Sequence, residues 1–173
     1  MYNYTEEQAK ERDIDWFCLS NNRPTHIASM GGKIPNDFLN MESLRYQQER
    51  VALIAPLHEA SLNLSAIQGE VKEGYEYLED EIVRGIVFET NSNNPGFEYL
   101  QDYSLPIRLY ASTFVEMARR GFYSYARIER AEGNRYVLIA EPYNPLGGDK
   151  LSQLHLRELD CEQIDGGIEI AFR

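Results

Sequence analysis

The residues best suited to catalysis lie close together near the start of the chain. They are two carboxylates, a thiol, an imidazole and an amine, namely Asp13, Asp15, Cys18, His26 and Lys33. Such groups can act as acid, base and nucleophile, and a histidine beside a cysteine can generate a reactive thiolate. One interpretation of the chain is therefore a small-molecule enzyme or ligand-binding domain with its site around Cys18, His26 and Lys33.

The pairing of Cys18 with His26 depends on the loop of a predicted β-hairpin. Two segments rich in strand-forming residues flank the turn-prone sequence NNRP, at 14–20 and 25–30. A two-residue loop places His26 opposite Phe17 or Leu19, in apolar surroundings, whereas a three-residue loop places it opposite Cys18. Because two-residue loops are the commonest in hairpins, the sequence favours a packed histidine over a reactive pair.

No motif for a metal, a phosphate or a serine nucleophile is complete. The three histidines lack the spacing of metal ligands, and no serine lies in a G-x-S-x-G sequence. The sequence MGGKIP at 30–35 places two glycines before Lys33, but it lacks the spacing and the Ser or Thr of a P-loop. It is better explained as a connection between a strand and a helix. We expect no cofactor and no bound metal.

Acidic residues are concentrated in one region of the chain. The sequence has 28 acidic and 17 basic residues and a net charge of -11. From Glu59 to Asp102 there are ten acidic residues and only two basic ones. Here the sequence EVKEGYEYLEDE mixes carboxylates with tyrosines, and it supplies four candidate partner-binding residues, Glu73, Tyr75, Glu76 and Tyr77. Such a surface would attract a basic partner, although a solvated face that maintains solubility explains the same pattern.

A second candidate surface follows from a hairpin predicted at 122–130 and 135–141. Alternation along its strands assigns one face to the core, with Phe122, Ala126, Ile128, Val137 and Ile139. The opposite face then carries Tyr123, Tyr125, Arg127, Glu129 and Tyr136, and of these the three tyrosines and Arg127 are candidate partner-binding residues. Tyrosines beside an arginine suit protein docking or the stacking of planar ligands. If another element covers this face, the same residues become part of the core.

Other patterns predict the elements that position these residues. The predicted helices lie at 5–12, 37–48 and 105–120, each beginning at a capping residue: Thr5, Asn36 and Ser104. We expect residues 1–12 to be loosely attached. The apolar run at 51–55 fits a buried strand, with the end of a helix as the alternative. A further strand is predicted at 82–90, and a last pair at 154–160 and 168–172 flanks the turn sequence DGG.

Together these elements predict an α+β fold in a single domain, residues 1–173. The sheet is mostly antiparallel, with about seven or eight strands built from hairpins and with two or three helices. The sequence shows no leader and no membrane-spanning run, and Cys18 and Cys161 lie far apart, as expected of free thiols, with a long-range disulfide as the alternative. We expect a cytoplasmic protein.

The net charge makes some classes of binding partner unfavourable. A net charge of -11 opposes binding to nucleic acid or to an anionic membrane surface. The first interpretation is therefore a non-enzymatic interaction module, of the kind of an inhibitor or immunity protein, that binds a partner protein with a basic surface. A third interpretation is a homo-oligomer whose copies bury the exposed tyrosines between them.

Overall fold

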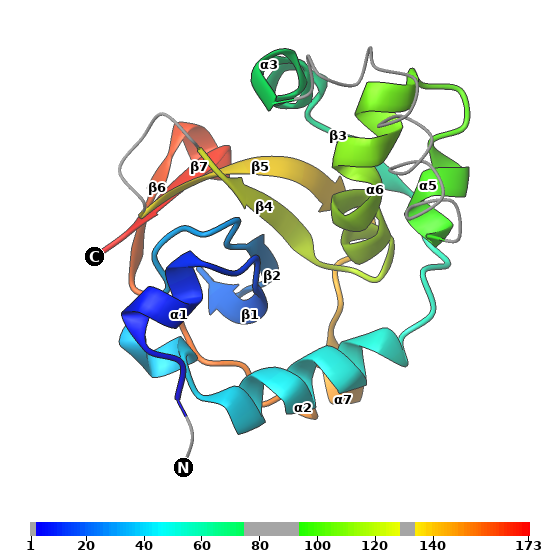
Figure 1. Cartoon of the computed structure of the whole chain (residues 1–173). Coiled ribbons are helices and arrows are strands. Elements are labelled where there is room, and N and C mark those ends of the chain that lie inside the picture. Colours follow the sequence, from blue (N-terminus) through cyan, green and yellow to red (C-terminus); the bar gives the residue numbers. More distant parts are fainter. Residues whose placement is uncertain (1–2, 75–93, 129–133) are drawn as a thin grey trace.

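A single curled sheet organises the fold (Figure 1). The computed structural model describes residues 3–74, 94–128 and 134–173. Its sheet has seven strands in the order β1-β2-β4-β5-β7-β6, and β3 pairs with β5 off this path. All described pairs are antiparallel except β2 with β4. The strands are β1 (Asp15–Ser20), β2 (Arg23–Ala28), β3 (Ala60–Leu62), β4 (Tyr123–Arg127), β5 (Arg135–Pro142), β6 (Cys161–Ile164) and β7 (Glu169–Phe172).

Three main helices and several short ones surround the sheet. The main helices are α2 (Met41–Ala52), α3 (Leu64–Gly74) and α6 (Leu105–Arg119). The short ones are α1 (Glu6–Lys10), α5 (Pro95–Tyr99), α7 (Gly148–Ser152), and the 3-10 turns η1 (Asn36–Phe38) and η3 (Asp165–Gly167). The predicted α+β fold with a mostly antiparallel sheet is confirmed. No helix in the described ranges has the length and apolarity needed to cross a bilayer.

The first hairpin has the predicted two-residue loop. Asn21 and Asn22 adopt left-handed backbone angles, with φ of 52° and 62°, as in the type I′ turns that match the twist of antiparallel strands. The resulting register places His26 opposite Phe17. The interpretation of His26 as a packed histidine is therefore confirmed, and Cys18 instead pairs with Thr25.

The two ends of the sheet meet and give it an inner face. Leu19 in β1 donates its N–H to Arg157 O and accepts from the N–H of Leu159, both at 2.8 Å. The segment 157–159 leads directly into β6, at the other end of the sheet, so the sheet closes into a half-barrel. Its interior is an aromatic and aliphatic core that includes Trp16, Ile27, Tyr125, Tyr136, Ile170 and Phe172.

Helices cover the outer face of the same sheet. Ala126, Val137 and Ile139 pack against α6 and α3 in a second core, through residues such as Ala111, Phe114 and Ile67. A smaller third cluster joins β1 to α2 and to the turn after α7, with Phe17, Val51, Phe122 and Leu154. Both faces of the central strands are therefore buried.

Burial of both faces corrects the prediction of an open tyrosine surface. Tyr125 and Tyr136 are only 1% and 0% exposed, and each donates its hydroxyl to a backbone carbonyl, of Gly167 and Lys33 respectively. Tyr123 and Arg127 are half-buried. The prediction was wrong for Tyr125 and Tyr136 because the alternation pattern cannot show that a sheet curls onto its second face.

Several predicted boundaries also change. The apolar run at 51–55 is the end of α2 and the turn after it, not a strand, and α2 begins after Asn40, whose side chain accepts from Ser43 N–H. The penultimate strand is β6, not residues 154–160. The predictions for 105–120 and for the DGG turn match α6 and η3. The strand predicted at 82–90 lies outside the described residues.

The described part of the N-terminal segment contacts the body of the protein. Thr5 and Gln8 form the predicted capping box of α1. Ala9 is buried in the inner core, and Tyr4 donates its N–H to Leu39 O at 3.0 Å. This attachment fixes the position of α1. Lys10 at its end and residues 12–15 after it line the two surface pockets described below.

Two helical glycines give a matched test of helix packing. A Cβ atom on Gly96 in α5 would lie 1.9 Å from the backbone oxygen of Ser112 in α6, whereas a Cβ on Gly69 in α3 would have no neighbour within 4 Å among the described residues. We expect Gly96→Ala to lower the free energy of unfolding by about 1–3 kcal/mol. Gly69→Ala should raise it by about 0.5–1 kcal/mol, because alanine favours a helix. Denaturant unfolding measures both changes, and equal effects would contradict the close approach of α5 to α6.

Candidate functional site

A chain of three polar side chains crosses three neighbouring strands on the outer face of the sheet. Asp15 begins β1, His26 lies in β2, and Ser124 lies in β4 directly opposite His26 in the parallel pair. His26 Nε2 lies 2.8 Å from Asp15 Oδ1, and His26 Nδ1 lies 2.6 Å from Ser124 Oγ. The side chain of His26 thus connects a carboxylate on one strand with a hydroxyl on another.

The carboxylate of Asp15 determines which atoms of these three side chains donate hydrogen bonds. An ionised Asp15 can only accept hydrogen bonds, so Nε2 of His26 carries a hydrogen and donates it. In the neutral imidazole, Nδ1 then accepts from the hydroxyl of Ser124. Every polar atom of the His26 ring therefore has a partner, which is what burial of the whole residue requires.

The same residue types form the triad of serine hydrolases, but here the carboxylate is exposed to solvent and the serine is buried. In a triad the serine faces the substrate and the carboxylate holds the histidine from behind. Here Ser124 and His26 are both 0% exposed, whereas the side chain of Asp15 is 40% exposed. No substrate carbonyl can reach Ser124, so this geometry does not support a serine nucleophile. Its effect is to fix the orientation of the Asp15 carboxylate at the surface.

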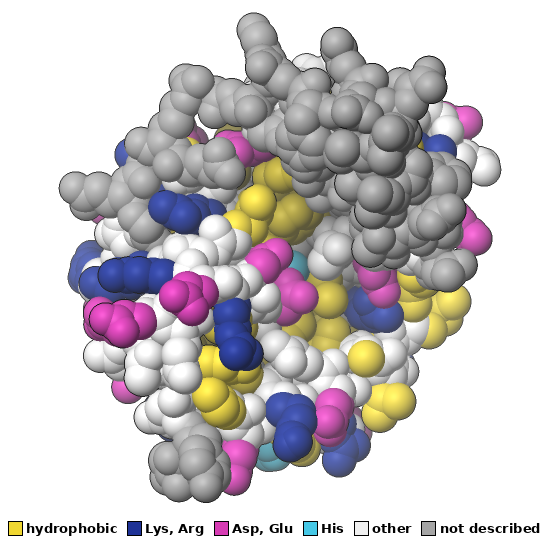
Figure 2. Space-filling view, viewed as in Figure 1, with side chains coloured by type: hydrophobic (Ala, Val, Ile, Leu, Met, Phe, Trp, Pro, Cys, Tyr) yellow, Lys and Arg dark blue, Asp and Glu magenta, His cyan; other side chains and the backbone are white. Residues whose placement is uncertain are grey.

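Asp15 opens into a surface pocket of about 490 Å³, which we call the acidic pocket. It lies between the segment 12–15, the middle of α2 and the end of α6, and its polar lining includes Arg12, Asp13, Asp15, Gln48, Glu116 and Arg120. Figure 2 shows acidic side chains gathered around a hollow near the middle of this face. Gln48 donates its amide to Asp15 O at 2.8 Å and so attaches α2 to the start of β1.

The charges of the acidic pocket are only partly compensated within the protein. Arg120 forms an ion pair with Glu116 at 2.6 Å and donates Nε–H to Ile54 O. Arg12 lies over the ring of Tyr4, 5.5 Å from its centroid. Among the described residues, neither Asp13 nor Asp15 forms an ion pair with a lysine or arginine. Two carboxylates are thus held at the surface without a strong cationic partner.

The pKa values of these two carboxylates shift in opposite directions. Partial burial raises the pKa of Asp13 above its ordinary value, more than the N–H of Met30 lowers it, and the charge of Asp15 adds to the rise. Burial also opposes ionisation of Asp15, but the hydrogen bond and charge of His26 outweigh it and leave the pKa of Asp15 below its ordinary value. Asp15 is therefore the more firmly ionised of the two.

The structure brings together only part of the residue set suggested by the first hairpin. Asp13 and Asp15 line the acidic pocket and His26 is buried behind Asp15, but Cys18 lies on the inner face of the curl and is 0% exposed. Lys33 lines a different pocket. Cys18 and Cys161 are both free thiols, as expected.

The remaining candidate residues are placed as follows. Glu73 lies near the end of α3, whereas Tyr75, Glu76 and Tyr77 lie outside the described residues. Ser124 and Glu116 were not predicted as site residues. No local spacing reveals them, because they approach the hairpin only through the pairing of β2 with β4 and the packing of α6.

Comparisons with protein-family models, with curated proteins and with solved structures found no match for this chain. Within the described ranges, no group of three or more His, Cys, Asp and Glu residues is arranged to hold a metal ion. Function is therefore argued from the chemistry of the site itself.

Removing each carboxylate should affect stability differently. Asp15→Ala leaves the buried Nε2–H of His26 without its acceptor, and we expect the free energy of unfolding at pH 7 to fall by about 1–3 kcal/mol. Asp13→Asn should leave it unchanged or raise it slightly, because the raised pKa of Asp13 means that its ionised form is disfavoured in the folded protein. Urea unfolding of both variants at pH 7 makes the comparison.

The pKa shifts of Asp13 and Asp15 determine how the stability of the fold changes with pH. The lowered pKa of Asp15 stabilises the fold above the ordinary value of 3.8, and this contribution is lost as the pH falls through the folded pKa. Asp13 acts in the opposite sense, because its contribution is lost as the pH rises through its raised pKa. Asp15→Ala should therefore lose less stability than the wild type on acidification below about pH 4. An unchanged acid limb would contradict the coupling of Asp15 to His26.

Cys18 should behave as an inert thiol. Burial raises the pKa of Cys18 well above its usual range, and the charges of Cys161 and Glu158 add to the rise. Alkylation of the native protein at pH 7.5 should therefore be much slower at Cys18 than at Cys161, which is partly exposed. Mass spectrometry after a timed exposure to iodoacetamide measures both rates. Fast labelling of Cys18 would revive the interpretation of a nucleophilic cysteine.

Proposed function

We propose that this protein is a non-enzymatic interaction module, comparable with inhibitors and immunity proteins, that binds a protein partner with a basic surface. In this proposal the acidic pocket receives a lysine or arginine side chain of the partner. The observation that carries the proposal is the pair of carboxylates, Asp13 and Asp15, which lie in a surface pocket without a lysine or arginine ion pair among the described residues.

The chemistry of the pocket suits a long cationic side chain. Asp15 is already oriented by His26, so an incoming guanidinium or ammonium group meets a preorganised acceptor and loses little free energy in ordering it. Met117, which is half-buried, also lines the pocket and offers apolar surface to the methylene groups of the same side chain. A basic residue of a partner would thus gain both an ion pair and packing.

The overall charge favours the same kind of partner. A net charge of -11 accelerates the approach of a basic protein, and the ten acidic residues between Glu59 and Asp102 would extend that attraction beyond the pocket. In this proposal Glu73, Tyr75, Glu76 and Tyr77 add a second contact area. The pocket supplies specificity, because it fixes where one basic side chain must lie.

A peptide titration tests the pocket directly. We expect a short peptide with two adjacent arginines to bind the wild-type protein in isothermal titration calorimetry, and the affinity to fall as salt is added. The same peptide with citrulline, the neutral isostere of arginine, should bind at least about tenfold more weakly, because it cannot form the ion pair. Asp15→Asn and Asp13→Asn should each lower the affinity for the arginine peptide, and Asp15→Asn should lower it by about tenfold.

Asp149→Asn is the matched control for this titration. Asp149 is exposed in α7, outside the acidic pocket, so its substitution removes the same charge from the molecule without changing the pocket. If Asp149→Asn weakens binding as much as Asp15→Asn, only the net charge matters and the pocket has no role. Equal affinity for the arginine and citrulline peptides would overturn the proposal as a whole.

A further inference from the structure

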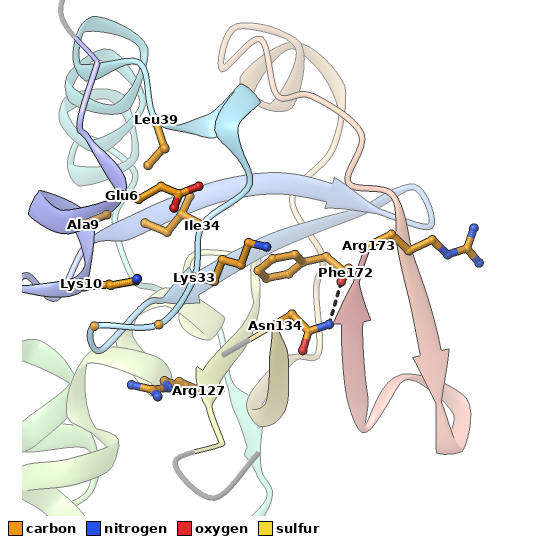
Figure 3. A pocket seen from close by; sticks show the side chains of 12 residues that line it. Glu6, Ala9, Lys10, Lys33, Ile34, Leu39, Arg127, Asn134, Phe172 and Arg173 are labelled. Atoms are coloured by element: carbon orange, nitrogen blue, oxygen red, sulfur yellow. Dashed lines mark hydrogen bonds between the residues drawn. The ribbon is translucent and has the colours of Figure 1, made fainter. Parts of the chain in front are cut away.

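A second pocket, on the other side of α1, has the opposite charge. Its volume is about 570 Å³, and it lies between α1, the loop 31–34 and the C-terminal strand β7 (Figure 3). Among the described residues that line it, four are cationic, Lys10, Lys33, Arg127 and Arg173, and one is acidic, Glu6. This excess is notable in a chain with 28 acidic and 17 basic residues. We call this site the basic pocket.

Three of the four cations are available to a ligand. Arg173 extends away from the pocket in Figure 3 and lies 3.6 Å from Asp160. Within the described part of the chain, Lys10, Lys33 and Arg127 have no ion pair. The guanidinium of Arg127 donates only a long bond, 3.4 Å, to Met30 O, and its buried Nε–H lacks a hydrogen-bond partner there. Glu6 lies beside Ile34 and Leu39, at the opposite end from Arg127.

The two glycines before Lys33 let the loop 31–34 pass close to Lys10 and Arg127. A Cβ on Gly31 would lie 2.8 Å from the backbone oxygen of Lys10, and a Cβ on Gly32 would lie 2.9 Å from Cδ of Arg127. The loop therefore fits closely between α1 and β4, and only glycine permits both contacts. Tyr136 fixes the next residue by donating its hydroxyl to Lys33 O at 2.7 Å. The sequence GGK acts here as a spacer that positions side chains, not as a P-loop.

The floor of the basic pocket is apolar. Ala9, Ile34, Leu39 and Phe172 line it and are each buried, with exposures of 2–4%. Lys33 and Phe172 line the same pocket, so it contains both a charged group and an aromatic ring (Figure 3). Asn134 donates to Phe172 O at 3.0 Å and holds this edge of the pocket in place. A volume of about 570 Å³ is typical of small-molecule sites.

We infer that the basic pocket binds a small organic anion, a carboxylate or phosphate attached to an aromatic or branched aliphatic body. The anionic group lies among Lys10, Lys33 and Arg127, and the body packs on Phe172 and Ile34. This inference is independent of the proposed function, because it uses different residues, the opposite charge and a different class of ligand. A purely electrostatic surface patch would have neither the buried apolar floor nor the closely fitted loop.

A matched set of small probes tests the inference. Phenyl phosphate and benzoate carry the two possible anions, benzyl alcohol carries no charge, and benzylamine carries the opposite charge. In titrations followed by ¹H–¹⁵N spectra, phenyl phosphate or benzoate should shift the amide signals of Gly31 and Gly32 to saturation. Benzyl alcohol and benzylamine should bind at least about tenfold more weakly, because they lack the anion that the cations attract. The stronger of the two anions identifies the headgroup.

Variants of Lys33 then separate charge from structure. Lys33 is exposed, so its substitution should leave the fold unchanged, as the remaining amide signals will show. Lys33→Ala should lower the affinity for the more tightly bound anionic probe by about tenfold, and Lys33→Arg should retain most of that affinity. Lys150→Ala is the control, because Lys150 is exposed and lines other pockets.

Three outcomes would overturn the inference. The first is that neither anionic probe shifts the signals of Gly31 and Gly32. The second is that benzylamine binds as well as phenyl phosphate, or that Lys33→Ala and Lys150→Ala have equal effects. The third is that inorganic phosphate alone binds as tightly as phenyl phosphate, which would show that the apolar floor contributes nothing. None of these results bears on the titration of the acidic pocket with arginine peptides.

Discussion

The pairing of β1 with the segment that leads into β6 determines much of this structure. Two backbone hydrogen bonds, from Leu19 to Arg157 and from Leu159 to Leu19, join the ends of the sheet. Because the sheet then curls, its inner face becomes a closed core around Trp16 and Tyr136, while α6 and α3 cover the outer face. Backbone pairing at an edge also protects β1 from pairing with other chains. Both surface pockets lie at the margins of this half-barrel, where loops and helix ends remain exposed.

Local patterns in the sequence predicted several of the elements but not their assembly. The hairpin turn at Asn21-Asn22, the capping box at Thr5 and helix α6 all follow from neighbouring residues, and all are found in the structure. The open tyrosine face was wrong because the closure of the sheet depends on residues far away in the chain. At 51–55 the preferred strand was wrong and the alternative, a helix end, is found, because a short apolar stretch fits both equally well.

The candidate site was predictable only in part, for the same reason. Asp13, Asp15 and His26 are close in sequence, and the hairpin register follows from its loop. The hydroxyl of Ser124, which completes the polar chain, arrives from a strand 98 residues away. The basic pocket likewise combines α1, the GGK loop, β4 and β7. The net charge of the chain could not predict the local excess of cations in this pocket, because a sum over the chain carries no information about position.

The parallel pairing of β2 with β4 has a consequence for how the chain folds. The first hairpin can form early, because its strands are joined by two residues, but one edge of β2 has no strand beside it until β4 has been synthesised. Contacts of such long sequence separation are slow to form, and a bare strand edge is a common starting point for aggregation. Nascent chains that end before Tyr123 should therefore depend on chaperones more strongly than chains in which β4 covers this edge of β2.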